Sequence, residues 1–356
     1  MKKVLIITNH SFMFWQFRRE LISTMLRSCM EVQIAVPAGP HTDDLQAMGC
    51  KMIDISVPFR QDWGLVKQYV QIIQEEKPHM VVTYGAICNI CAGLACRRTK
   101  TTHCANVQGL GKLAQNSAAS FLQKLLYRIA LKKAKAVFFE NAANAAFFLE
   151  NKLVAEAQQT ILPGAGVNLR HYSLQPYPDN STVRFLYIGR MQQEKGTDEL
   201  LAAIKMLYDD CYEVRLDLVG EPDKAYAEQL EPLKAMGIVV VHGFQEDPRP
   251  FYAAADCVVM PSHGEGMSNV LLEAAATGRP VIASYIPGCR EVVDEARTGF
   301  TCRTQDKYAL YEAMKRIADM PRPQREEMGK QGRARMEEHF DKLMVVEDTM
   351  NTIFRL

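Results

Sequence analysis

The fold of the second half of the chain is decided by a strand–loop–helix stretch that reads Met260-Pro261-Ser262-His263-Gly264-Glu265-Gly266-Met267-Ser268-Asn269-Val270-Leu271-Leu272-Glu273-Ala274. An apolar strand ends at Met260, a loop punctuated by glycines carries the carboxylate of Glu265, and a helix begins near Ser268 or Asn269. Ser and Asn are good N-caps, and the free N-terminus of a helix is a ready site for an anion. A surface helix needs no such loop, so the pattern favours a ligand site over a plain connection.

Apolar strands alternate with helices on both sides of this stretch. In the second half the predicted strands are Val183–Ile188, Val214–Val219, Ile238–Val241, Cys257–Met260 and Pro280–Ala283, and the predicted helices are Asp198–Tyr208, Ala225–Met236 and Asn269–Ala276. In the first half the strands are Val4–Thr8, Glu31–Val36, Met52–Val57, Met80–Thr83 and Ala136–Phe139, and the helices are Trp15–Arg27, Leu65–Gln74 and Ile87–Cys96. Fully apolar strands separated by helices predict parallel sheets covered on both faces.

The alternation breaks at Leu162-Pro163-Gly164-Ala165-Gly166-Val167 and resumes after Thr182. We therefore predict an α/β chain of two doubly wound domains, 1–165 and 166–340. The last predicted helices are Pro323–His339 and Leu343–Phe354, and a C-terminal helix at about 341–356 could pack back on the first domain. Ligands of such sheets lie at the carboxyl ends of the strands, so we expect them in a cleft that the two domains face.

Composition excludes several classes of protein. The 356 residues include no run of the roughly 20 apolar residues that a membrane-spanning helix needs. The ten cysteines have no regular spacing, which favours free thiols in a reducing compartment and a cytoplasmic location. Cys88 and Cys91 have the spacing of metal ligands, but a helix would turn both to one buried face, so buried thiols are the favoured interpretation and no metal is expected.

Charge is unevenly distributed, because residues 1–170 are net basic and the remainder is net acidic. This favours an anionic surface or a phosphate-bearing partner for the first half, although undirected drift of surface charge would give the same result. The segment 121–135 is amphipathic and basic. It could lie on an anionic membrane, or it could face the core with a solvated basic side. No recognisable nucleic-acid readout module accompanies the basic half, so nucleic acid is not indicated.

A second strand end carries cations, in the order Ile188-Gly189-Arg190 and then Lys195-Gly196. A glycine at a strand end lets a ligand approach the backbone, and an Arg and a Lys together can clamp a diphosphate. Two solvated surface cations are the plain alternative. The strand-end loops Val219-Gly220-Glu221-Pro222 and His242-Gly243-Phe244 could flank a nucleotide base.

Taken together, Gly189-Arg190, Lys195-Gly196, the segment from Glu265 to Ala274 and Gly278-Arg279-Pro280-Val281-Ile282-Ala283 resemble glycosyltransferase family 4. The likeness includes the Glu-x7-Glu motif and the phosphate-binding Arg/Lys pair of that family. It is strong from about Val183 to Gly299 and weaker, though colinear, across the first half. The resemblance implies the GT-B fold, which has two Rossmann-like domains. The first domain would bind the acceptor and the second would bind the nucleotide sugar.

The resemblance also implies roles for individual residues. Arg190 and Lys195 would hold the donor diphosphate, helped by the amides around Ser268 and Asn269. Glu265 would contact hydroxyls of the transferred sugar near the backbone of Gly266 and Met267, and Glu273 would bond the ribose. Relatives of this kind are retaining and generally need no metal, so no cofactor is expected; fixed cations can stabilise the departing diphosphate instead.

The first half departs from the commonest family pattern. Asn9-His10-Ser11-Phe12-Met13-Phe14-Trp15 occupies a loop where many members have a glycine pair, and Gln108 falls where many have a histidine. His10, Arg18 and Gln108 are the candidate acceptor-binding residues, although Arg18 could equally form a salt bridge on a helix. His10 and His103, as lone histidines near strand ends, are more often hydrogen-bonded scaffolding than catalytic groups.

The arrangement is closer to that of bacterial enzymes that build surface glycans on polyprenyl diphosphate. We therefore expect a retaining transferase that moves a hexose or N-acetylhexosamine from a UDP-sugar to a lipid-linked saccharide, at the cytoplasmic face of the membrane. A GDP-mannose-dependent mannosyltransferase is the nearest alternative. A sugar-nucleotide epimerase and a non-catalytic glycan-binding protein are alternatives from other classes. The presence of the Arg190 and Lys195 diphosphate clamp disfavours the non-catalytic protein, because binding a glycan does not require it.

Overall fold

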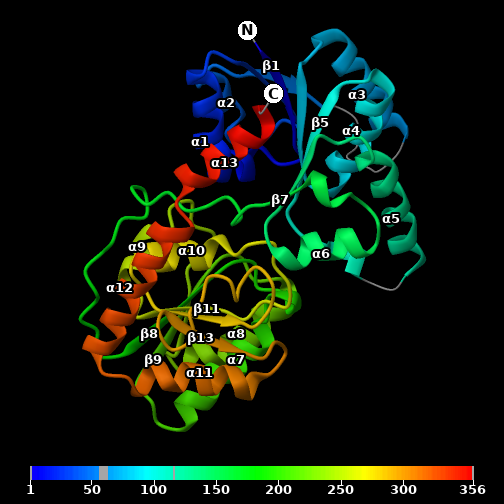
Figure 1. Ribbon diagram of the computed structural model, residues 1–356. Helices are drawn as coiled ribbons and strands as arrows, with labels where there is room; N and C mark the ends of the chain where they lie inside the picture. The colour runs from blue at the N-terminus through cyan, green and yellow to red at the C-terminus, as the bar shows by residue number, and fades with distance from the viewer. Residues whose placement is uncertain (1, 56–62, 115–116, 355–356) are drawn as a thin grey trace. The chain divides into compact units, whose positions relative to one another are not determined.

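The computed structural model of the chain describes residues 2–55, 63–114 and 117–354. These residues form two compact units, each with its own parallel sheet (Figure 1). Unit 1 consists of Met1–Ala165 together with Leu343–Leu356, and unit 2 consists of Gly166–Lys342. Both are α/β units of the doubly wound type expected from the alternating apolar strands.

The sheet of unit 1 has seven strands in the order β3-β2-β1-β4-β5-β6-β7, and every pairing is parallel. The strands are β1 (Lys3–Ile7), β2 (Glu31–Val36), β3 (Lys51–Asp54), β4 (Met80–Tyr84), β5 (Thr102–Val107), β6 (Ala136–Phe139) and β7 (Gln159–Ile161). The central strands β1 and β4 are buried on both faces, which is why they lack polar alternation.

Helices cover both faces of this sheet, with α1, α2 and α13 on one side and α3, α4 and α5 on the other (Figure 1). They are α1 (Ser11–Arg27), α2 (Thr42–Ala47), α3 (Trp63–Glu76), α4 (Ala86–Thr99), α5 (Ala118–Leu131), α6 (Ala142–Glu150) and α13 (Lys342–Phe354), with short 3₁₀ turns η1 (Gly111–Ala114) and η2 (Glu156–Gln158). The terminal helix α13 inserts Val345, Val346 and Ile353 into the core beside α1.

The sheet of unit 2 has six parallel strands in the order β10-β9-β8-β11-β12-β13. They are β8 (Val183–Ile188), β9 (Val214–Val219), β10 (Val239–Val241), β11 (Cys257–Met260), β12 (Val281–Ser284) and β13 (Gly299–Cys302). The helices are α7 (Thr197–Asp209), α8 (Lys224–Ala235), α9 (Arg249–Ala254), α10 (Asn269–Ala276), α11 (Lys307–Asp319) and α12 (Arg322–His339), with the 3₁₀ turn η3 (Gln193–Lys195).

Most predicted strands and helices of the long apolar segments are confirmed, and the differences are local. The strand predicted at Met52–Val57 ends at Asp54, and Val57 lies outside the described residues. The basic segment 121–135 is helical only as far as Leu131. Beyond that point the backbone N–H of Lys135 donates to the carbonyl oxygen of His103, where the chain approaches β6. The strands β5, β7 and β13 were not predicted, because β5 mixes Thr, His, Cys and Asn with its apolar residues and the other two are short.

The prediction that Cys88 and Cys91 are buried thiols is confirmed. Cys88 and Cys91 lie on the buried side of α4 against α3, and burial raises the pKa of the Cys88 thiol to about 12. The described residues contain no group of three or more His, Cys, Asp or Glu side chains placed to hold a metal ion. Among these residues there is also no helix both long and apolar enough to cross a membrane.

Candidate donor site at the carboxyl edge of the second sheet

The predicted donor residues of unit 2 meet at one edge of its sheet. The strand order places β8 between β9 and β11, so the loops that follow these three strands emerge side by side. Gly189, Arg190 and Lys195 follow β8, Gly220 follows β9, and Glu265 follows β11. Because all strands are parallel, these loops lie at the carboxyl edge, where ligands of doubly wound sheets bind.

The loops at this edge touch through their backbones, and glycines make that approach possible. A Cβ at Gly196 would lie 2.1 Å from the carbonyl oxygen of Pro261, and one at Gly220 would lie 2.1 Å from that of Gly189. Gly196 also has a positive φ of 73°, which L side chains rarely adopt. The loops after β8, β9 and β11 are thus packed against one another rather than free in solvent.

The contact between Lys195 and Glu265 is the central polar feature of this edge. Lys195 Nζ lies 2.6 Å from Glu265 Oε1, and both side chains are partly buried. The sequence assigns Lys195 to a diphosphate and Glu265 to a sugar, and the structure brings the two side chains into an ion pair. A compact cation and a carboxylate therefore stand together between the loops after β8 and β11.

Arg190 is exposed at the same edge, directly after β8. Its backbone is fixed, because the hydroxyl of the buried Tyr187 donates to the carbonyl oxygen of Arg190 at 2.7 Å. Burial and then the charge of Glu265 raise the pKa of Tyr187, so this hydroxyl stays protonated and keeps its donor role. The backbone that carries the exposed Arg190 side chain is thus held at this edge.

The helix α10 begins at Asn269 with Ser268 as N-cap, as the sequence predicts. However, the Ser268 side chain makes no hydrogen bond to the first turn, and the Ser268 amide donates to the carbonyl oxygen of Gly288 at 2.8 Å. The Ser268 amide is therefore already hydrogen-bonded within the protein, and an anion at this helix would meet the amides that follow Ser268. The first turn of α10, beginning with Asn269, receives no side-chain cap from Ser268 and remains suited to an anion.

The neighbouring loop residues Gly266 and Met267 are held by the loop after β12. A Cβ at Gly288 would lie 2.2 Å from the carbonyl oxygen of Gly266, and Gly288 has a positive φ of 85°. The Met267 side chain is buried in the core of unit 2. Gly288 is thus a structural residue of this edge that the sequence reasoning missed, although the Pro287-Gly288 dipeptide is a turn signal that could have found it.

Glu273 lies one turn into α10 and is buried. Its Oε2 accepts a hydrogen bond of 2.8 Å from the hydroxyl of Tyr252. Burial raises the pKa of Glu273 to about 7, and the hydrogen bonds from Tyr252 and Tyr172 oppose this rise. The two tyrosines that hold Glu273 were not singled out from the sequence, because nothing in their spacing links them to it.

Gly220 and Phe244 belong to adjoining loops after β9 and β10. The amide of Gly220 donates to the carbonyl oxygen of Gly243 at 2.8 Å, and the amide of Phe244 donates to Glu221 Oε1 at 3.0 Å. The ring of Phe244 is 60% exposed. The Phe244 ring is thus exposed beside Gly220 on a backbone fixed in this way, and aromatic faces stack on planar groups.

The candidate acceptor residues of unit 1 divide into two kinds. His10 and Gln108 are exposed in the loops that follow β1 and β5, which lie on either side of β4. Arg18 is buried instead: it lies 3.3 Å from Glu140 and against the ring of Tyr84, with the charged carbon 5.1 Å from the ring centre. The salt-bridge alternative thus describes the observed position of Arg18, although the ion pair with the partly buried Glu140 lies inside the unit and not on a helix surface.

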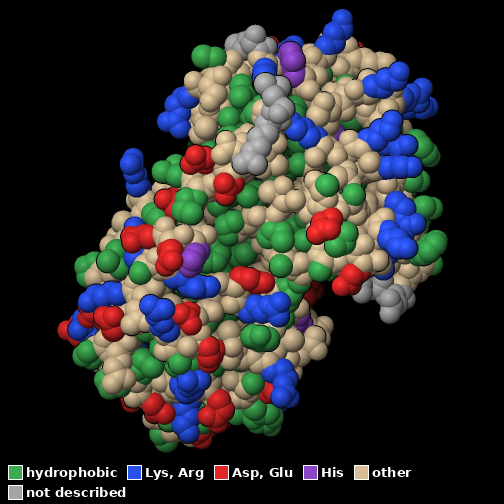
Figure 2. All heavy atoms as spheres, in the orientation of Figure 1, with side chains coloured by type: hydrophobic (Ala, Val, Ile, Leu, Met, Phe, Trp, Pro, Cys, Tyr) green, Lys and Arg blue, Asp and Glu red, His purple; other side chains and the backbone are tan. Residues whose placement is uncertain are grey.

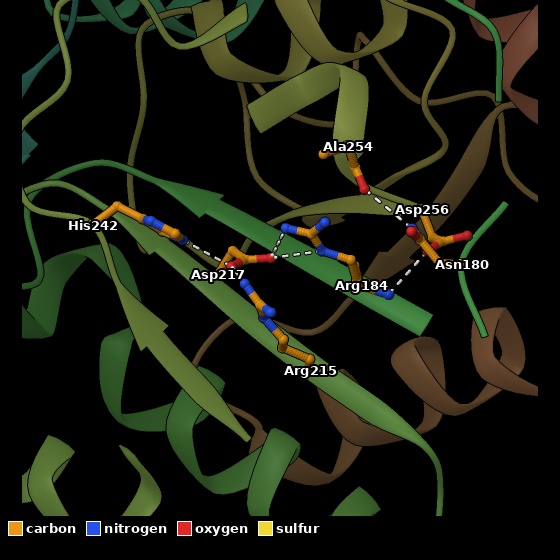
Figure 3. Close-up of polar contacts among 7 residues, drawn as sticks. All are labelled: Asn180, Arg184, Arg215, Asp217, His242, Ala254 and Asp256. Carbon is orange, nitrogen blue, oxygen red and sulfur yellow. Dashed lines mark hydrogen bonds and ion pairs between the residues drawn. The ribbon is translucent and has the colours of Figure 1, made fainter. Parts of the chain in front are cut away.

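Beneath the donor edge, a buried carboxylate in the middle of β9 gathers three basic side chains (Figure 3). Asp217 accepts from Arg184 Nη2 at 2.9 Å, Arg215 Nη2 at 2.6 Å and His242 Nε2 at 2.8 Å. Burial acts to raise the pKa of Asp217, but these hydrogen bonds outweigh it, so the pKa lies below its ordinary value. This cluster was missed, although an Asp inside the apolar strand Val214–Val219 is a visible signal.

Comparison with known proteins identifies both halves of the chain. Residues 3–141 match the family described as "Glycosyl transferase 4-like", and residues 182–320 match "Glycosyl transferases group 1". The N,N'-diacetylbacillosaminyl-diphospho-undecaprenol alpha-1,3-N-acetylgalactosaminyltransferase of Campylobacter jejuni is 25% identical over 321 residues, which cover 84% of each chain. The capsular polysaccharide biosynthesis glycosyltransferase CapM of Staphylococcus aureus is 30% identical over 166 residues, 46% of this chain and 43% of that protein.

The fold has close counterparts among solved structures. A sucrose-phosphate synthase of Thermosynechococcus elongatus superposes with a TM-score of 0.80 over 100% of this chain and 98% of that one, at 20% identity. With the two domain matches and the paired parallel sheets, this shows the GT-B fold. The chain belongs to the family 4 glycosyltransferases, with a glycosyl transferase 4-like first domain and a group 1 second domain.

Proposed function

We propose that the chain is a retaining glycosyltransferase that moves a hexose or N-acetylhexosamine from a UDP-sugar to a saccharide carried on polyprenyl diphosphate. The observation that carries the proposal is the meeting of Lys195, Glu265, Arg190 and the start of α10 at one edge of the unit 2 sheet. A site for a neutral glycan alone would not need two cations and a helix N-terminus at the same edge.

The donor would bind to unit 2 with its diphosphate between Arg190, Lys195 and the first turn of α10. Lys195 can serve both Glu265 and a phosphate, because an ammonium group has three N–H donors. Glu265 has a second oxygen, Oε2, with which to accept a hydroxyl of the transferred sugar. Glu273 would accept a ribose hydroxyl beside Tyr252, and the Phe244 ring near Gly220 would stack on the base.

Catalysis would rest on stabilising the leaving diphosphate. Arg190 and Lys195 would place positive charge where negative charge develops, and electrostatic stabilisation of this kind usually supplies the largest catalytic term. The acceptor hydroxyl would attack from the face that the nucleotide leaves, and its proton would pass to a phosphate oxygen. In this scheme no side chain acts as general base and no metal ion is required.

The nature of the acceptor is proposed from relatives and from the surface of unit 1. The Campylobacter relative, which matches over most of both chains, is named for a diphospho-undecaprenol-linked acceptor. His10 and Gln108 stand exposed at the carboxyl edge of the first sheet, where an acceptor saccharide could bind. Arg18, paired with Glu140, would act by shaping this edge rather than by direct contact.

A peripheral position at the cytoplasmic face of an anionic membrane is supported by helix α5. Its buried side includes Tyr127, Ala130 and Leu131, whereas Phe121 and Leu125 on its other side are 74% and 42% exposed. The outer face of α5 is therefore apolar as well as basic. A core-facing helix with a solvated basic side would instead have buried these apolar side chains. Apolar side chains flanked by cations suit the interface of an anionic bilayer.

The donor assignment can be tested by titrating the purified protein with UDP, GDP, ADP and their sugars, with and without EDTA. We expect UDP-sugars to bind most tightly and EDTA to have no effect. Arg190→Ala and Lys195→Ala should each weaken nucleotide binding about ten-fold or more, as loss of a charge-assisted contact does. The exposed Arg297→Ala and Lys205→Ala serve as matched controls. Unchanged binding in both site variants would refute the phosphate assignment.

The same titration separates the alternatives. Selective binding of GDP-mannose would favour the mannosyltransferase. Conversion of the donor without any acceptor would indicate an epimerase, and glycan binding without nucleotide binding would indicate a non-catalytic protein. Retention is tested by the anomeric configuration of the product, read by NMR from the coupling at the new glycosidic carbon.

A further inference from the structure

A cavity lies at the amino edge of the unit 1 sheet, where α4 and α5 end and β5 begins. Its volume is about 350 Å³, and the polar residues that line it include Arg97, Lys100, Thr102, His103 and Lys133. Gln108 follows the opposite end of β5, and at about 3.3 Å per residue the length of this strand separates the two edges by roughly 20 Å. The cavity is therefore distinct from the edge at which the acceptor is proposed to bind.

The cavity is strongly basic. Three of its lining residues, Arg97, Lys100 and Lys133, are cations, and none of the described residues that line it is acidic. The C-termini of α4 and α5 each contribute about half a negative charge, which the three cations exceed. Arg97 donates one hydrogen bond, from Nη1 to the carbonyl oxygen of Ile129 at 2.5 Å near the C-terminus of α5. The guanidinium has further N–H groups with which to donate to a ligand. The surroundings favour an anion.

The chain segment that contains the cavity cations has no acidic residue to neutralise them. From Ala86 to Phe139 the chain has nine Lys and Arg residues and no Asp or Glu, so the neighbouring helices α4 and α5 carry no internal partner for these cations. Figure 2 shows Lys and Arg side chains gathered over α4 and α5, with hydrophobic side chains between them. Charge complementarity must come from outside this segment.

A buried histidine gives the cavity a second recognition element. His103 is 3% exposed, and its Nδ1 is buried with no hydrogen-bond partner among the described residues. Its Nε2 lies 2.9 Å from Thr83 Oγ1, which itself lies 2.6 Å from Asn89 Oδ1. An amide oxygen only accepts, so the Thr83 hydroxyl donates to Asn89 and must accept from Nε2–H of His103.

It follows that Nδ1 of His103 carries a lone pair and not a proton. Burial lowers the pKa of His103 to about 4, so the ring is neutral at physiological pH. A buried acceptor without a donor is costly, and a ligand that donates a hydrogen bond would relieve that cost. The occupant of the cavity should thus offer negative charge to the cations and a hydroxyl to the histidine.

We propose that this cavity binds a phosphate ester of a polyol, with the phosphate held by Arg97, Lys100 and Lys133 and a hydroxyl donating to Nδ1 of His103. Two sources have this chemistry: the headgroup of a lipid such as phosphatidylglycerol, and a free polyol phosphate. The outer face of α5 runs along the same side of unit 1, with Phe121, Leu122, Leu125 and Ile129 exposed. At about 100° per residue these four share one arc of the helix, and Lys133 lies in the turn just beyond its end.

The site can be tested on the full chain by calorimetric titration with glycerol 3-phosphate, without any nucleotide. We expect saturable binding that Lys133→Gln weakens about ten-fold, since one charge-assisted contact is lost. Lys132→Gln is the matched control, because Lys132 is an equally exposed neighbour that does not line the cavity. Equal weakening by both variants, or no saturable binding, would overturn the proposal.

The hydroxyl assignment is tested with propyl phosphate, which has the charge of glycerol 3-phosphate but no hydroxyl. It should bind about five- to ten-fold more weakly, and equal affinity would overturn the role of His103. Flotation with phosphatidylglycerol–phosphatidylcholine vesicles then separates the sources. Vesicle binding that glycerol 3-phosphate displaces and Lys133→Gln weakens supports the lipid, whereas glycerol 3-phosphate binding without vesicle binding supports the free ester. Since no donor is present, failure here leaves the transferase proposal intact.

Discussion

Each unit of the molecule gathers three basic side chains in one place, but only one unit supplies their counter-ion. In unit 2, Arg184, Arg215 and His242 converge on the buried carboxylate of Asp217. In unit 1, Arg97, Lys100 and Lys133 converge on a cavity lined by no acid among the described residues. A cluster neutralised within the chain is part of the framework, whereas a cluster left uncompensated is suited to an external anion.

The largest effect is expected when the framework cluster is broken. Asp217→Asn leaves Arg184, Arg215 and His242 without their carboxylate, and breaking one partner of a buried ionic group typically costs about 3–5 kcal/mol. Urea unfolding should therefore show a large loss of stability of unit 2. Because the folded pKa of Asp217 is lowered, its contribution is present above the unfolded pKa and is lost as the pH falls through the folded value. The difference between parent and variant should shrink in strong acid.

The matched control for this variant is Asp209→Asn, whose carboxylate pairs with Lys205 on the exposed surface of α7. Exposed pairs of this kind contribute about 0.3–0.5 kcal/mol. Equal stability losses for the two variants would contradict the view that the Asp217 cluster is structural.

The Lys195–Glu265 pair is an intermediate case, because the cation has a carboxylate of its own and is also proposed to hold the diphosphate. Lys195→Ala should lower kcat about 100- to 1,000-fold, in the range found when one electrostatic contact to a transition state is removed. This change in kcat is measured by steady-state kinetics with the preferred nucleotide sugar. Stability should change far less than for Asp217→Asn, because Lys195 is only partly buried. A kcat within a factor of two of the parent would exclude Lys195 from the chemistry.

Glu273 is the reverse case, a buried carboxylate whose observed hydrogen bond comes from a tyrosine hydroxyl rather than a cation. Its folded pKa of about 7 exceeds the unfolded value, so stability falls as the pH rises from about 4.5 to 7. Glu273→Gln should therefore stabilise the nucleotide-free protein at pH 8 by about 1–3 kcal/mol, with little effect at pH 4. The same variant should weaken nucleotide binding.

Thermal unfolding at both pH values, alongside titration with UDP, checks this prediction. Glu231→Gln is the control, since Glu231 is an exposed carboxylate on α8. A variant that is less stable than the parent at pH 8 would show that the Glu273 charge is compensated after all.

The smallest effect is expected when unit 1 is given the counter-ion that it lacks. Thr102→Asp places a carboxylate among the cations of the cavity, where Thr102 is exposed. An exposed ion pair contributes about 0.2–1 kcal/mol, so unit 1 should gain slight stability at low salt while losing affinity for glycerol 3-phosphate. Thr102→Asn, which adds no charge, is the control. Unchanged affinity in the Asp variant would argue against a phosphate in the cavity.

The sequence predicts the fold well where apolar segments are long and uninterrupted. Val183–Ile188, Val214–Val219 and Asn269–Ala276 have the bounds expected from their patterns. It fails for β5, because Thr102, His103 and Asn106 interrupt the apolar run. His103 and Asn106 are accommodated by hydrogen bonds with Thr83 of β4 and Asn89 of α4, which are not neighbours in sequence. Local patterns cannot reveal such contacts.

The candidate site shows the same limit. Strand-end position was enough to bring the loops of Arg190, Lys195 and Glu265 to one edge, because parallel strands fix that edge. Position along the chain did not reveal that Lys195 and Glu265 contact each other, that the Ser268 amide is taken by Gly288, or that Tyr252 holds Glu273. These depend on side-chain direction and on loops that meet only in the folded unit.

The return of α13 to unit 1 has a consequence for how the protein is made. Val345, Val346 and Ile353 belong to the core of unit 1, yet they follow all of unit 2 in the chain. While the ribosome is translating, unit 1 must wait with an apolar face uncovered beside α1 until the whole of unit 2 has been synthesised. Synthesis order thus makes the earlier-encoded domain the later one to mature, and the one more dependent on protection from aggregation in the interval.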